Sequence, residues 1–272
     1  MSKDKETENM TFWGHLQELR SNLIRSSIAI VVFSIVAFVN KDILFHNVIL
    51  APKESFFFTN EAFCFLSEWL SMPVLCINKM PVKIINIELA GQFTTHIMVS
   101  LIAGIIISVP YILWEFWRFI KPGLHKNERK NTRFAVLKTS ALFFAGVLFS
   151  YFLIVPLAIN FLGSYQVSEL VENNISLKSY INTVTLLTLA TGLVFELPVV
   201  VYFLSRIGIV TPAIMKKNRK IAYVIIIILS AIITPPDVFS QILISIPLIF
   251  LYEFSIGISK KQYQKRNSGP SS

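Results

Sequence analysis

Six long apolar runs dominate this sequence and set what it can fold into. A bilayer core is about 30 Å thick. Inside it only helices or closed barrels satisfy their own backbone hydrogen bonds. The runs do not alternate between polar and apolar residues as barrel strands do, so we expect an all-α integral membrane protein with six transmembrane helices. The runs are Leu23–Val39, Ile97–Trp114, Ala141–Leu162, Ile181–Leu204, Ile221–Thr234 and Val238–Ile256.

The composition supports a single membrane domain over residues 1–272, because 54% of the residues are hydrophobic and only 15% are charged. We expect a lead-in at 1–22, an outer loop at 40–92 and a tail at 257–272. The first run has no small-residue cleavage site at its end, so we expect it to remain as an anchor and not to be removed as a signal peptide.

The basic residues predict the orientation. Twenty of the 25 Lys and Arg residues lie in the two termini, at the start of run 1, or in and beside the loops between runs 2 and 3 and between runs 4 and 5. The positive-inside rule therefore places both termini in the cytoplasm. This bias also explains the net charge of +9. Because the cations flank the spans and form no separate soluble domain, we expect no nucleic-acid partner.

The outer loop carries further signals. We expect Glu61–Val74 to form a helix on or near the outer membrane surface; the alternative is a seventh span, which would bury two carboxylates, Glu61 and Glu68. Cys64 and Cys76 are the only cysteines. An oxidising compartment would permit a disulfide between them. The alternative is two free thiols that serve as small apolar side chains.

The last two runs are short. Ile221–Thr234 has 14 residues, which is about 21 Å of helix, and the TPPD turn that follows ends the helix. Such a mismatch thins the bilayer or favours cover by another helix. The alternative is that the helices continue into their polar flanks. Thr234 and Gln241 could bond a neighbouring membrane helix, or be satisfied inside the bundle.

Two carboxylates lie among cations at the predicted cytoplasmic face, Glu18 and Glu128. Together they suit a ligand that carries paired cations. Glu18 shares a helical face with Asn22 and Arg25, off the apolar stripe of the lead-in. The alternative for Glu18 is a solvated charge on an amphipathic helix, and for Glu128 an ordinary positive-inside loop.

Glu196 lies inside the fourth run, where a carboxylate costs about 3 kcal/mol unless it is hydrated or paired. Pro198 follows and leaves the carbonyl of Val194 without its helical donor. A kinked and partly wet pocket, with a functional carboxylate, is the first interpretation; a structural polar contact is the second.

Motifs for catalysis are missing from the sequence. It has no phosphate-binding GxxxxGK[ST] loop, no HExxH and no GxSxG. The four histidines, at positions 15, 46, 96 and 125, have no metal-site spacing. We therefore expect no cofactor, no metal and no enzymatic activity.

Five segments carry a resemblance to a known family, the TatC family of twin-arginine protein translocases. They occur in family order and cover nearly all of the membrane region, and FELPV and TPPDVFSQ are uncommon strings. The segments are FWGHLQELR (12–20), FWRFIKPGLHKNER (116–129), AGVLFSYFLIVP (145–156), TGLVFELPVVVYFL (191–204) and LSAIITPPDVFSQILISIPLIFLYE (229–253).

The resemblance implies a receptor for signal peptides with an Arg-Arg pair on folded cargo, exported by the proton-motive force across a bacterial inner membrane. It implies that Glu18 and Glu128 bind the two arginines. It also implies that the apolar part of the peptide inserts along the concave inner face of the bundle, towards Glu196. It implies single-span TatA- and TatB-type partners near Thr234 and Gln241, and self-association. The residues expected to shape the arginine site are Leu16, Arg20, Phe119, Pro122, Leu124 and Arg129.

Two other functions stay open on the residues alone. A secondary transporter of a small cation would use Glu196 and not need Glu18 or Glu128, but we find no internal repeat of the kind such transporters often carry. A membrane-embedded enzyme would need a nucleophile or metal cluster.

Overall fold

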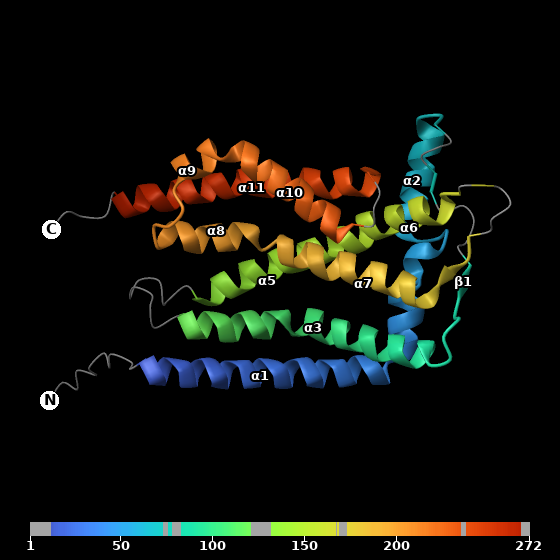
Figure 1. Ribbon diagram of the computed structural model, residues 1–272, viewed down its shortest axis with the longest axis horizontal. Coiled ribbons are helices and arrows are strands. Elements are labelled where there is room, and N and C mark those ends of the chain that lie inside the picture. Colours follow the sequence, from blue (N-terminus) through green and yellow to red (C-terminus); the bar gives the residue numbers. More distant parts are fainter. Residues whose placement is uncertain are drawn as a thin grey trace. The chain divides into compact units, whose positions relative to one another are not determined.

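The computed structural model describes residues 12–72, 76–77, 83–120, 132–166, 168, 173–234 and 238–267. Almost all of them are helical (Figure 1). The α-helices are α1 (Phe12–Val39), α2 (Phe58–Trp69), α3 (Gly91–Ile120), α5 (Thr132–Phe149), α6 (Val155–Ser164), α7 (Leu177–Val194), α8 (Leu197–Arg206), α9 (Pro212–Lys217), α10 (Arg219–Ile233) and α11 (Val238–Asn267).

Shorter elements join these helices. They are two π-helical turns, η1 (Ile43–Ile49) and η5 (Ser150–Ile154), a 3-10 turn η2 (Ala51–Lys53), and the strands β1 (Ile84–Ile85) and β2 (Ile175–Ser176). The two strands pair in parallel, with Ile84 opposite Ile175.

Five helical segments in the described part of the chain are long and apolar enough to cross a membrane: Leu16–Val39, Gly91–Ile120, Phe134–Ser164, Leu177–Arg206 and Gln241–Gln264. The remaining run forms α10, which has 15 residues, or about 22 Å of helix. The prediction of a short fifth span therefore agrees with α10. For the sixth run the structure agrees with the alternative, because α11 continues for 30 residues into its polar flank.

The chain divides into two compact units, Met1–Val39 with Ser100–Ser140, and Asn40–Val99 with Ala141–Ser272. In the first unit α1 and the later part of α3 run antiparallel in direct backbone contact. A Cβ atom on Gly104 would lie 2.6 Å from the backbone nitrogen of Ser34 and 2.8 Å from its Cα. Only glycine permits this approach.

The second unit holds an apolar core made by η5, α6, α7, α10 and α11. Its fully buried members include Ile154, Ile181, Leu187 and Ile244. The hydroxyl of Tyr180, buried on α7, donates to the carbonyl of Ile49 at 2.8 Å. This bond ties the connection after α1 to the core of the second unit.

The outer connection contains the short helix α2, and Figure 1 shows that α2 runs across α6 and not along it. Twelve residues give about 18 Å, so the alternative of a seventh span was wrong. The Thr59 hydroxyl donates to the carbonyl of Phe152, and the ring of Phe57 stacks on Phe152. Cys64 and Cys76 form a disulfide that joins α2 to the segment after it.

We predict that Gly104→Ala destabilises the protein, because the added methyl group meets the backbone of Ser34. Overpacking of this kind costs roughly 1–3 kcal/mol. The measurement is the thermal midpoint in detergent. Gly257→Ala is the matched control: nothing lies within 4 Å of its Cβ position on α11. An equal midpoint for the two variants would contradict the close contact.

Removal of the disulfide should lower the stability of the outer connection. Cys64→Ser with Cys76→Ser opens a loop closed over 12 residues, worth roughly 3 kcal/mol in the chain-entropy model. We expect a lower thermal midpoint for the double variant. Reductant should lower the midpoint of the wild type and leave that of the variant unchanged. A reductant effect on both would show that the bond is not the cause.

Candidate functional site

Glu18 lies in the second turn of α1, on the helical face that also carries Asn22 and Arg25. The spacings of four and three residues put the three side chains in a row. Glu18 is half-buried, and no ion pair to it occurs among the described residues. It is thus a carboxylate held on a helix without a cationic partner in the described part of the chain.

The same face of α1 packs on α3. The side-chain amide of Asn22, itself buried, approaches the backbone carbonyl of Glu115, with 3.5 Å between nitrogen and oxygen. Arg25 Nη1 lies 3.7 Å from Glu115 Oε1. Because α1 and α3 are antiparallel, Glu18 lies one turn beyond Asn22 at the end of α3 that carries Phe119. The structure therefore brings Glu18 and Phe119 to the same end of one helix pair.

The other predicted residues are distributed differently. Leu16 and Arg20 are exposed on α1, but each is two residues from Glu18, which turns it about 200° away around the helix. They do not share the face of Glu18. The structure does not describe the other four predicted residues, Pro122, Leu124, Glu128 and Arg129. The second predicted carboxylate, Glu128, therefore stays a prediction.

Sequence reasoning missed one carboxylate, Glu115. It is 3% exposed, although it lies near the end of a membrane helix. Arg118 Nη1 lies 3.9 Å from its Oε1, the atom that Arg25 also faces, and Tyr111 interacts with it from one turn before. The second carboxylate oxygen, Oε2, has no hydrogen-bond partner in the described part of the chain. Glu115 directly follows the end of the apolar run at Trp114, so hydropathy placed it in the polar flank of that run.

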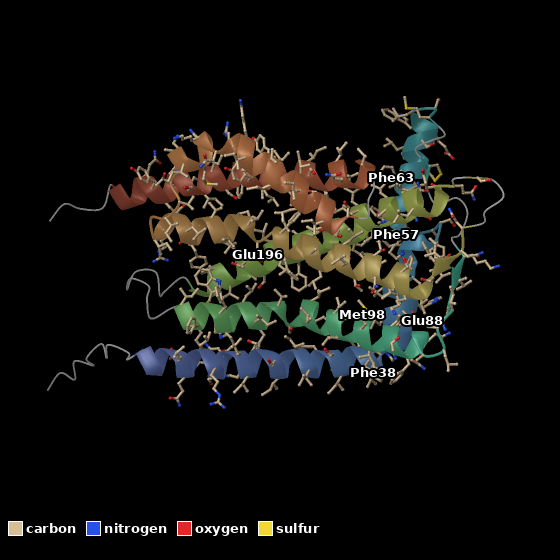
Figure 2. All side chains as sticks on the ribbon, in the orientation of Figure 1. Phe38, Phe57, Phe63, Glu88, Met98 and Glu196 are labelled. Carbon is tan, nitrogen blue, oxygen red and sulfur yellow. A yellow bond between two sulfur atoms is a disulfide. The ribbon has the colours of Figure 1, made fainter. Side chains whose placement is uncertain are left out.

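Glu196 belongs to the second unit, at the break between α7 and α8 (Figure 2). The break confirms the kink that Pro198 predicted, since Pro198 lies in the first turn of α8. Glu196 Oε1 is buried and has no hydrogen-bond partner among the described residues, and the same holds for the hydroxyls of Thr191 and Ser150. These buried polar atoms belong to segments long and apolar enough to cross a membrane. The wet pocket at Glu196 stays a prediction.

The predicted partner-helix residues lie around α10. Thr234 is buried and donates to the carbonyl of Ser230 at 2.8 Å, so its hydroxyl is satisfied within its own helix. The Gln241 amide donates to the carbonyl of Ile227 at 3.2 Å. A cavity of about 210 Å³ opens between α7 and α10; its lining residues are Asn182, Thr183, Leu186, Leu187, Ile232, Ile233 and Thr234.

Comparison with known proteins identifies the family. The family model of the Sec-independent protein translocase protein TatC matches residues 14–247. The chain belongs to the TatC family. A TatC protein of Blattabacterium sp. subsp. Periplaneta americana is 37% identical over 256 residues, which are 93% of this chain and 96% of that protein. The TatCy protein of Bacillus subtilis is 32% identical over 260 residues, covering 96% of this chain and 92% of the relative.

Solved structures agree with this assignment. A crystal structure of a twin-arginine translocase receptor TatC superposes with a TM-score of 0.67 at 35% identity, covering 91% of this chain and 99% of that one. A second, solved in the detergent DDM, gives a TM-score of 0.68 at 36% identity, covering 90% and 99%. The chain is therefore a component of the Sec-independent protein translocase and a multi-pass protein of the inner membrane, and it is not an enzyme. The alternatives of a small-cation transporter and of a membrane-embedded enzyme have no support from the family.

Proposed function

We propose that this chain binds Arg-Arg signal peptides of folded cargo at the cytoplasmic face, through Glu18 and Glu128. Both termini would lie in the cytoplasm, on the side that carries most of the Lys and Arg residues. One observation carries the proposal: Glu18 is a half-buried carboxylate without an ion pair among the described residues, held on α1 beside the end of α3. Phe119 supplies an apolar contact at the same end.

The chemistry of the two partners supports this proposal. A guanidinium presents parallel N–H donors that match a carboxylate in a bidentate, charge-assisted pair. A lysine ammonium offers a compact charge without that planar fork. A site with two carboxylates would therefore prefer Arg-Arg over Lys-Lys at equal net charge. Bound cargo would then be exported by the proton-motive force, which agrees with a sequence that has no phosphate-binding loop.

Single-span partner subunits of the TatA and TatB type would pack on α10. This helix is shorter than a bilayer core, and a short helix favours cover by a neighbour. The adjoining cavity is lined by the exposed Asn182 and by Thr183, both near the start of α7. Polar side chains there can bond a partner helix. Gln241 has a second amide hydrogen and a carbonyl oxygen with which to do the same.

The full chain in nanodiscs should bind a labelled Arg-Arg signal peptide more tightly than its Lys-Lys version. Glu18→Ala should weaken Arg-Arg binding at least tenfold, since a hydrogen bond to a charged group contributes about 1.5–3 kcal/mol. Glu128→Ala should have a similar effect. Fluorescence anisotropy gives the dissociation constants.

Glu88→Gln serves as the matched control, because it removes a carboxylate that pairs with Lys178 in the second unit. It should bind both peptides as the wild type does. Equal affinity for the two peptides in the wild type, or loss of binding in Glu88→Gln, would contradict the assigned site.

Site-specific cross-linking tests the partner surface. Ile232→Cys places a thiol in the cavity wall on a residue that is 71% exposed, and the native cysteines are paired. We expect disulfide formation with a cysteine-scanned single-span partner. Ile28→Cys on α1, 57% exposed, is the control and should not react. Equal reaction at both positions would argue against a docking surface at α10.

A further inference from the structure

Glu115 is a buried charge whose contacts are poor for a purely stabilising role. Both arginine contacts, at 3.7 and 3.9 Å, fall on Oε1, whereas direct charge-assisted bonds measure about 2.7–2.9 Å. Its Oε2 has no partner within the described residues. Buried ion pairs of this kind often contribute little to stability compared with neutral side chains of similar size. Stabilisation of the packing between α1 and α3 is therefore a weak explanation for a carboxylate at position 115.

Arg25 lies between Glu115 and Glu18. Its Nη1 faces Glu115, while its Nη2 donates to the Ser21 hydroxyl at 2.7 Å. Ser21 is one turn back along α1, and Glu18 is three residues before Ser21 on the same face. The guanidinium thus already extends towards Glu18. The backbone distance from Arg25 to Glu18 is about 10.5 Å along the helix, which two long side chains can bridge.

Arg25 also has the chemistry of the proposed ligand. Its guanidinium would pair with the Glu18 carboxylate in the same bidentate manner as an arginine of the signal peptide. A side chain tethered two turns away has a high effective concentration, as any intramolecular competitor has. A free Arg25 would therefore occupy Glu18 and exclude the peptide.

We infer that Glu115 is a positioning residue that retains Arg25 and so keeps Glu18 open for an arginine of the signal peptide. The inference rests on the proposed function, in which Glu18 binds that arginine. Glu115 can retain Arg25 because the two helices fix its carboxylate beside the guanidinium. The loose geometry is sufficient for this task, because Arg25 only has to be held away from Glu18.

Arg118 allows an experiment that distinguishes the retention of Arg25 from an effect of net charge. It faces the same Oε1 atom as Arg25, but it lies on α3, and its side chain is 59% exposed. Removing either arginine changes the net charge by the same amount. Only Arg25 shares a helical face with Glu18.

The test is peptide binding to the full chain in nanodiscs. Glu115→Gln keeps the shape and removes the charge, and it should weaken Arg-Arg binding about tenfold, within the range of a hydrogen bond to a charged group. Glu115→Gln with Arg25→Gln should return the affinity to the wild-type value. Glu115→Gln with Arg118→Gln, which has the same net charge, should stay weak.

Several results would overturn the inference. The first is wild-type affinity in Glu115→Gln. The second is equal recovery of affinity in both double variants, which would indicate an effect of net charge alone. The third is recovery in neither double variant, which would indicate a structural role for Glu115. Elution profile and thermal midpoint report folding for every variant. Should Glu115→Gln not fold, Glu115→Asp keeps the charge but shortens the side chain, and it should show a smaller loss that Arg25→Gln also restores.

Glu88→Gln is the control for loss of a carboxylate as such. Glu88 pairs with Lys178 at 2.9 Å in the second unit (Figure 2), and its variant should bind as the wild type does. A wild type without Arg-Arg preference would overturn the proposed function, and this inference with it. A retained preference together with an unaffected Glu115→Gln would overturn the inference alone.

Discussion

The contact between α1 and α3 is the constraint on which the candidate site depends. Gly104 lets the two backbones meet at Ser34, and Asn22 and Arg25 meet Glu115 further along the same pair. Two contacts separated along a helix fix both its rotation and its register. The face that carries Glu18 is therefore directed by packing elsewhere on α1, in the manner of a functional group supported by a rigid scaffold.

Much of the fold could be predicted from hydrophobic runs. Apart from the break at 195–196 and the last residue of the fifth run, Thr234, the described helices contain all six runs. The break at Glu196 follows from Pro198, a residue whose effect is local. The length of α11 could not be predicted in the same way. Apolar content marks where a helix meets lipid, but the helix itself continues as long as its backbone bonds persist, and the polar residues after Ile256 do not interrupt them.

The candidate site was predictable only in part. Glu18 stood out because it lies off an apolar stripe, and its helical row with Asn22 and Arg25 is a matter of spacing along one helix. Glu115 could not be found in this way, since its role depends on which residue of α1 it faces. That pairing is set by the register between two helices far apart in sequence, and spacing within either helix does not contain it.

The break between α7 and α8 has a mechanical consequence. Helix α7 packs through Ile181 and Leu187 in the core that also holds Ile244 and Leu248 of α11. Helix α8 meets α11 further along, where the Ser205 hydroxyl donates to Ser259 at 2.8 Å. One membrane segment thus consists of two rods attached to different stretches of α11, with a joint at Phe195 and Glu196. A bend of α11 between Leu248 and Ser259 would carry α8 with it and flex the segment at this joint.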